Sequence, residues 1–282
     1  LWKQVAFYSI LICLLNAVTI GVTRTDVVKA IFPISAKTYW FASVYMGLLV
    51  LMPFVSMVAA RMTRRQYQYL LGALTLFLSV NHMIFRVDTY GTFSGRELPW
   101  FIYLTLLAGY VKLHTKEDRR YAWYGFAGYV VSSLAVLASV YLSVKTHQED
   151  IGYFLNYNSP LALLGTLALF VCVRNLPWKE SKLDVVILKV AGAAFGVYLI
   201  HDNYLIRYLV WDTFRVSKVA KTHWAMIYAV AVAAIVYLAC TLLELLRQQL
   251  MKWFAPIWEK TLLYRKEQNL YLKITKRVND LS

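Results

Sequence analysis

A series of long apolar runs constrains what this chain can fold into more than any other feature of its sequence. A helix of about 20 apolar residues spans the hydrocarbon core of a bilayer. The chain has 282 residues, 60% of them hydrophobic, which is too apolar for a domain with a fully wetted surface. The runs cover residues 3–22, 39–60, 67–85, 98–113, 121–144, 159–176, 185–203 and 223–246. The sequence therefore predicts an all-α, polytopic transmembrane helical bundle of about eight spans.

Two of these runs depart from a regular span. The run 98–113 is short, and the run 185–203 contains Gly192 and Gly196. Irregular backbone is tolerated at membrane depth only where protein or water satisfies it. Either run is therefore a candidate for a tilted, broken or re-entrant helix.

Basic residues predict the orientation of the chain. The net charge of +15 would suggest nucleic acid in a soluble protein, but here Lys and Arg lie in loops and in the tail, where anionic headgroups attract them. We therefore expect membrane lipids and no nucleic acid among the partners. Sixteen basic residues flank the spans on the side that carries both ends, against ten on the other side. This excess predicts that both ends are cytoplasmic.

The sequence divides into residues 1–247, a single transmembrane domain, and residues 248–282, a basic amphipathic cytoplasmic tail. The tail mixes apolar positions with Lys and Arg, as in a helix lying on an anionic membrane surface, with an interruption expected at Pro256. A solvated tail that acts only on topology is the alternative. Cys13, Cys172 and Cys240 lie in apolar runs without metal-ligand spacing, so we expect core residues and no metal site.

His82 and Arg86 form the most specific polar pair. Their i, i+4 spacing places both on one helical face near the end of the run 67–85. Histidine exchanges protons near neutral pH, and arginine holds a carboxylate, a phosphate or a developing oxyanion, so the pair could bind substrate and support acyl transfer. Two side chains that snorkel to the membrane interface are the alternative.

Two further segments contain candidate substrate-binding residues. Tyr39 and Trp40 enter the second run, where the sequence alone favours an interfacial aromatic belt over substrate binding. His201, Asp202 and Asn203 end the apolar run 185–203 and could hydrogen-bond a polyhydroxylated acceptor, although an ordinary helix end has the same composition.

Residues 157–160, Tyr-Asn-Ser-Pro, open the sixth run. Asn158 or Ser159 suits the N-cap of that helix, and Pro160 suits its first turn. Capping is therefore the role we expect for this segment. No soluble catalytic motif is recognisable in the chain, so no catalytic residue is assigned.

Several segments, in order along most of the chain, resemble acyltransferase family 3, the polytopic membrane O-acyltransferases. They are residues 39–54, 93–110, 157–160 and 195–203. The resemblance implies transfer of an acyl group, commonly acetyl from acetyl-CoA or another acyl-CoA, to a hydroxyl of a cell-surface polysaccharide. It also implies a glycan acceptor, the bacterial plasma membrane and no bound cofactor. From the residues themselves, we expect substrate binding at Tyr39, Trp40, His82, Arg86, His201 and Asn203.

The family pattern also has a basic N-terminal segment and a span with a functional histidine, which are not recognisable here. The chain begins with Leu1, and two further spans upstream would bring the expected eight to the ten usual in the family, so we expect a truncated sequence. A transporter or flippase for a glycan or lipid-linked substrate is the rival class, because several spans and intramembrane polar residues serve it equally well. A non-catalytic assembly role is a third possibility.

Overall fold

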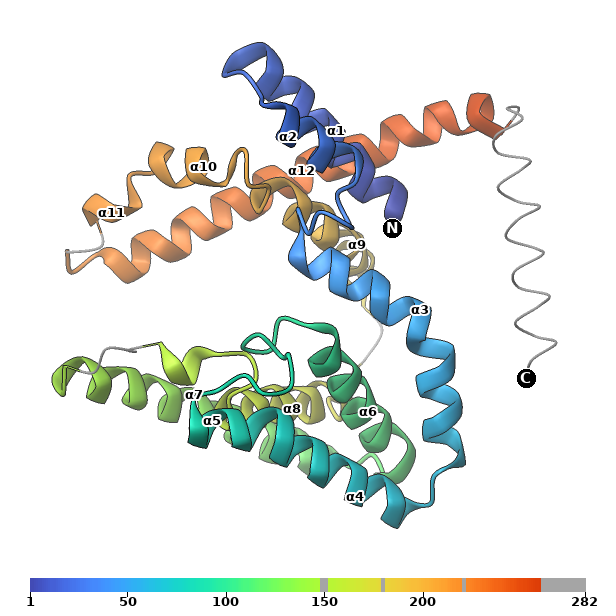
Figure 1. Ribbon diagram of the computed structural model, residues 1–282, viewed down its shortest axis with the longest axis vertical. Coiled ribbons are helices and arrows are strands. Elements are labelled where there is room, and N and C mark those ends of the chain that lie inside the picture. The colour runs from blue at the N-terminus through green and yellow to red at the C-terminus, as the bar shows by residue number, and fades with distance from the viewer. Residues whose placement is uncertain (148–151, 179–180, 220–221, 260–282) are drawn as a thin grey trace. The chain divides into compact units, whose positions relative to one another are not determined.

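The computed structural model describes residues 1–147, 152–178, 181–219 and 222–259, and the regular elements within these ranges are all helices. Seven of the described helices are long and apolar enough to cross a membrane, which confirms the predicted all-α polytopic architecture. The run 98–113 forms helix α6 (Leu98–His114), which has only 17 residues, so its membrane crossing stays a prediction. The chain divides into two compact units, which are described in turn (Figure 1).

The first unit comprises residues 1–31 and 181–282. Its helices pack around α9, which contacts both α1 and α12. A capping box between Ser181 and Asp184 begins α9, which then continues unbroken through Gly192 and Gly196. Of the three alternatives expected for this run, the broken helix is therefore wrong. The helices of this unit are α1 (Trp2–Thr19), α2 (Arg24–Ile31), α9 (Lys182–His201), α10 (Arg207–Thr213), α11 (Val216–Val219) and α12 (Ala225–Glu259).

Helix α12 is longer than its apolar run, because it continues through Pro256 to Glu259. The predicted interruption at Pro256 is wrong, and the boundary drawn after residue 247 falls inside this helix. Residues 260–282 of the predicted tail lie outside the described part of the chain. Contact of the tail with the membrane surface stays a prediction.

The second unit comprises residues 32–180. Helix α3 packs against α6, and α7 packs against α8 along much of its length. Gly125 permits the α7–α8 approach, since a Cβ there would lie 2.6 Å from the backbone oxygen of Ala168. Figure 1 shows α3 bending part-way along its length, as expected for a helix with an internal proline, Pro53. The remaining bounds are α3 (Trp40–Arg61), α4 (Arg64–Thr75), the π-helix η1 (Leu76–Val80), α5 (Asn81–Phe85), α7 (Arg119–Lys145), the 3₁₀ helix η2 (Tyr153–Leu155) and α8 (Pro160–Arg174).

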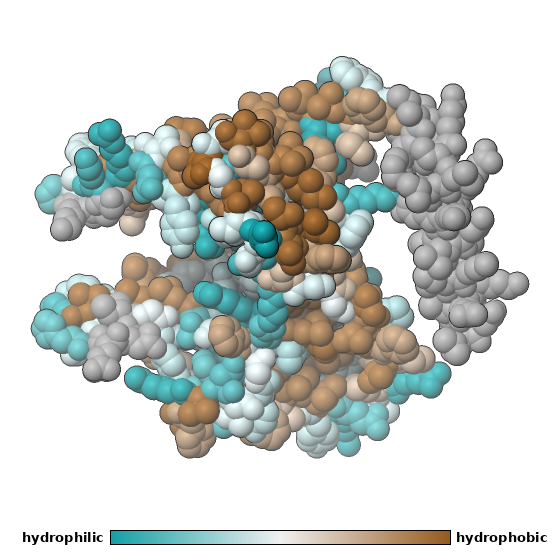
Figure 2. All heavy atoms as spheres, turned by 45° about the horizontal axis from the view of Figure 1, so that its top comes forward, coloured by the Kyte–Doolittle hydropathy of each residue, from teal (hydrophilic) through white to brown (hydrophobic). Residues whose placement is uncertain are grey.

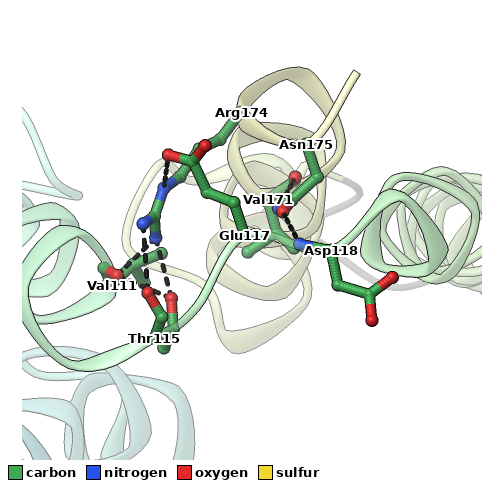
Figure 3. A network of polar contacts seen from close by, with 7 residues as sticks. All are labelled: Val111, Thr115, Glu117, Asp118, Val171, Arg174 and Asn175. Atoms are coloured by element: carbon green, nitrogen blue, oxygen red, sulfur yellow. Dashed lines mark hydrogen bonds and ion pairs between the residues drawn. The ribbon is translucent and has the colours of Figure 1, made fainter. Parts of the chain in front are cut away.

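One end of the second unit is held by Arg174, at the last position of α8 (Figure 3). Its guanidinium donates to the carbonyl oxygen of Val111, to Oγ1 of Thr115 at 2.7 Å and to the carbonyl oxygen of Thr115 at 3.1 Å. Nearby, the backbone N–H of Asp118 donates to Oδ1 of Asn175. These bonds satisfy carbonyls at the end of α6 and fix the turn into α7.

Large apolar side chains lie exposed along the helices of both units, and brown apolar atoms cover much of the face in Figure 2. In a soluble protein such a surface would be an aggregation hazard. On helices of this length it is the surface that lipid tails cover. The chain is an integral membrane protein.

Candidate functional site

The candidate site lies at the end of the continuous helix formed by α4, η1 and α5. A capping box between Thr63 and Gln66 begins this helix. It ends at Arg86, whose positive φ of 54° takes the chain out of the helix. Its π-helical turn, Leu76–Val80, directly precedes His82. Wide turns of this kind occur often at functional sites.

His82 has one buried ring nitrogen without a hydrogen-bond partner among the described residues. Its Nδ1 lies 3.3 Å from the carbonyl oxygen of Val87. Its Nε2 is buried and has no hydrogen-bond partner among the described residues. Because a buried polar atom without a partner costs free energy, a rearrangement that lets a substrate hydroxyl or a water molecule reach this nitrogen would be compensated by the hydrogen bond formed.

Tyr153 brings His82 and Arg86 together. The His82 ring stacks on the Tyr153 ring at a centroid distance of 6.2 Å, and the Arg86 guanidinium lies 4.9 Å from the same centroid. The Tyr153 hydroxyl donates to the carbonyl oxygens of His82 and Met83, both at 2.7 Å. His82 and Arg86 thus share an aromatic partner, but not the predicted helical face, because Arg86 is the left-handed C-cap residue just beyond the helix.

Asp88 holds the loop that follows. Its carboxylate accepts hydrogen bonds from the backbone N–H and hydroxyl of Thr92, both at 2.8 Å, and from the backbone N–H of Phe93. Partial desolvation raises the pKa of Asp88, but these hydrogen bonds and the nearby His82 outweigh it and hold the pKa below its usual range. The loop is thereby fixed in a conformation with positive φ at Phe93, Ser94 and Gly95.

Asn158 lies completely buried between this loop and the π-helix. Its side-chain nitrogen donates to the carbonyl oxygen of Leu78 and to Oγ1 of Thr92, and its backbone oxygen accepts from the Ser79 hydroxyl at 2.7 Å. Its Oδ1 is buried without a hydrogen-bond partner in the described part of the chain. We call His82, Arg86, Asp88, Thr92, Tyr153 and Asn158 the His82 cluster.

Trp40 reaches the same end of the second unit, whereas Tyr39 is in the interior. The Trp40 ring lies 5.9 Å from that of Tyr157, whose backbone N–H donates to the carbonyl oxygen of Ser94. Tyr39 is fully buried, so an interfacial belt does not explain it. The structure thus brings Trp40, His82 and Arg86 to one loop-lined end of the unit.

His201 and Asn203 belong to the first unit and lie at the end of α9. His201 Nδ1 lies 2.7 Å from the carbonyl oxygen of Val197. Asn203 Oδ1 accepts from the N–H of Leu205, and Asp202 pairs with Arg207 at 3.3 Å. These contacts form the turn that ends α9, as an ordinary helix end does.

The same turn is tied to α2. The Tyr204 hydroxyl donates to Asp26 at 2.8 Å. Hydrogen bonds from the Thr23 hydroxyl and backbone N–H, together with that from Tyr204, lower the pKa of Asp26. The turn that follows α9 is therefore braced against α2, and Asn203 within it is buried.

A comparison with models of protein families identifies the family of this chain. A model of the acyltransferase domain matches residues 1–244. The chain belongs to acyltransferase family 3. Comparisons with curated proteins and with solved structures found no match. The matched residues include the whole His82 cluster. Together with the spanning helices, the match identifies the chain as a membrane acyltransferase.

Sequence reasoning about this acyltransferase missed several polar residues. Asp88 and Tyr153 lie in or next to loops, where polar and aromatic residues are ordinary. Of the two expected caps of α8, Ser159 takes the role by accepting from the N–H of Ala162, and Asn158 is buried between the loop and the π-helix instead. Glu244 had a clear signature, an acidic residue inside an apolar run, and the structure buries it completely. No group of three or more His, Cys, Asp or Glu within the described ranges could hold a metal.

Proposed function

We propose that this acyltransferase transfers acetyl from acetyl-CoA to a hydroxyl of a cell-surface or exopolysaccharide sugar, and that the His82 cluster binds the acceptor. One observation carries the assignment to this cluster. The buried Nε2 of His82 has no partner among the described residues, while Arg86 lies on the same Tyr153 ring. A hydrogen-bonding ring nitrogen beside a cation suits a sugar hydroxyl close to a developing negative charge.

The reaction balances without a further co-reactant. The sugar hydroxyl oxygen attacks the thioester carbonyl carbon, the new C–O bond forms, and the C–S bond breaks as the tetrahedral intermediate collapses. The hydroxyl proton ends on the thiol of coenzyme A. In this scheme His82 Nε2 accepts the hydrogen bond of the attacking hydroxyl, and Arg86 stabilises negative charge on the substrate.

Arg86 suits this role because it is exposed and makes no ion pair with any described residue. With its φ of 54°, Arg86 is the first residue after α5, at the start of the loop. A guanidinium already placed by an aromatic ring loses less entropy on binding an anion than a free side chain does.

The experiment measures transfer of labelled acetyl from acetyl-CoA to surface glycan in membranes that contain the full-length protein. We expect His82→Ala and Arg86→Ala to lower the acceptor kcat/KM by about 10²-fold or more. His223→Ala, at an exposed histidine elsewhere, is the matched control and should be neutral. Acetylation unchanged in both cluster variants would remove the cluster from the site. Substrate transport without acyl transfer would assign the chain to the transporter class.

We further propose a bacterial plasma membrane with both ends of the chain in the cytoplasm, supported by the sixteen to ten excess of flanking basic residues. Single cysteines introduced at Lys145 and Lys260 test the orientation. In intact cells an impermeant thiol reagent should label position 145 and spare position 260. The opposite pattern would reverse the topology.

A further inference from the structure

A groove with a volume of about 350 Å³ lies between α1 and α12 in the first unit. One stripe of each helix forms its walls, from Phe7 to Asn16 on α1 and from Leu243 to Leu250 on α12, and Ile200 and Ile206 complete the lining. Nearly all of these side chains are apolar. The groove therefore offers little to water or to a polar ligand.

Its size matches a single hydrocarbon chain. The α1 wall extends over nine residue steps, or about 14 Å at 1.5 Å per residue. The groove is therefore elongated and lined by apolar side chains, a shape and chemistry that suit one extended acyl chain.

The groove opens toward the bilayer. Leu15 and Leu246, one on each wall, are both 57% exposed. On spanning helices, exposed apolar side chains face lipid tails. An acyl chain can therefore enter sideways from the membrane.

The end of the groove at Arg247 is positively charged. The Arg247 guanidinium lies 5.7 Å from the Phe7 ring and 5.8 Å from the Tyr8 ring. Lys252 is exposed further along α12. Glu244, the acidic partner of Arg247, has a fully buried side chain. The Arg247–Glu244 pair is neutral overall, so the net positive charge at this end comes from Lys252, and a positive charge complements a phosphate headgroup.

We propose that this groove binds one acyl chain of an anionic phospholipid, with the chain between α1 and α12 and the phosphate near Arg247 and Lys252. The bound lipid fills the space between the two helices. This site lies in the first unit and does not depend on the substrate proposed for the His82 cluster.

The test uses matched tryptophan substitutions on α12. Leu246→Trp fills the groove, whereas Leu242→Trp adds the same side chain at an exposed position that is not in the lining. The purified full-length protein is exchanged into nanodiscs of phosphatidylcholine with phosphatidylglycerol, and retained lipid is counted by native mass spectrometry after release into detergent. Wild type and Leu242→Trp should retain phosphatidylglycerol. Leu246→Trp should retain at least about tenfold less, since about two displaced methylene groups already correspond to that ratio.

A second pair of substitutions, on α1, distinguishes loss of lipid from a folding defect. Leu11 lines the groove and Leu14 is exposed outside it, so Leu11→Trp should lose lipid and Leu14→Trp should keep it. Monodisperse elution of each variant establishes that it is folded. Equal retention in lining and control variants, or equal retention of phosphatidylcholine and phosphatidylglycerol by the wild type, would overturn the proposal. Lys252→Gln should weaken the preference for phosphatidylglycerol while keeping the chain bound.

Discussion

The Tyr8 hydroxyl donates a 2.6 Å hydrogen bond to Oε2 of Glu244, a carboxylate 236 positions later in the chain. The same carboxylate accepts from the side chains of Gln4 and Gln248 and from Nε and Nη2 of Arg247. A charge buried in a membrane protein needs such partners. This network joins α1 to α12.

Removal of the Glu244 carboxylate should therefore destabilise the protein strongly. Glu244→Ala leaves Arg247 and the Tyr8 hydroxyl without their acceptor in a buried setting. Loss of one member of a buried ion pair typically costs about 3–5 kcal/mol of unfolding free energy. Thermal unfolding in detergent measures the change. Glu97→Ala, which breaks the exposed Lys37–Glu97 pair, is the matched control and should cost at most about 1 kcal/mol. Equal effects would show that Glu244 is not a structural anchor.

Gly196→Ala should destabilise the contact between α9 and α12. A Cβ at Gly196 would lie about 2.5 Å from Cγ and Cδ of Glu244, and that side chain is held by its hydrogen bonds. Overpacking of this kind typically costs about 1–3 kcal/mol. Gly192→Ala, one turn earlier in α9, meets nothing within 4 Å and should be neutral or slightly stabilising. The difference between the two unfolding midpoints is the measurement, and identical midpoints would contradict the packing argument.

The loop after His82 should loosen in acid. The folded pKa of Asp88 lies below its usual value of about 3.9, so its carboxylate stabilises the folded loop fully above that pH. This contribution is lost as the pH falls through the folded pKa. Limited proteolysis of residues 87–97 between pH 6 and pH 3 follows the change. Asp88→Asn should be cleaved readily throughout this range, and protection of the variant equal to that of wild type at pH 6 would contradict the assignment.

Tyr153→Phe tests whether the tyrosine positions His82. The substitution keeps the ring beneath His82 and Arg86 but removes the hydroxyl that donates to two carbonyls of α5. Loss of these bonds releases the helix end, so we expect the acceptor KM to rise several-fold. The free energy of unfolding should fall by about 1–3 kcal/mol. Tyr124→Phe, at an exposed ring on α7, should leave KM unchanged. An unchanged KM in Tyr153→Phe would deny it a positioning role.

The spans and several helix ends follow from local sequence. Apolar runs specify membrane helices because length and hydropathy alone decide insertion. The Ser159–Pro160 pair begins α8, as its residue types predict. The run with Gly192 and Gly196 shows the limit of local rules, because these glycines do not break α9. Gly196 instead leaves room for Glu244.

By itself the sequence determined that this protein is helical, lies in a membrane and carries a His82–Arg86 pair at a helix end. The tertiary structure alone decided that Tyr153 joins this pair, that Asn158 is buried against the π-helix and that Glu244 links α1 to α12. Tyr153 and Asn158 meet partners between 66 and 80 positions away, and Glu244 meets α1 from more than 200 away. Periodicity and capping act within one or two helical turns. Which distant polar groups meet is decided when the folded helices bury them, because each must then find a partner there.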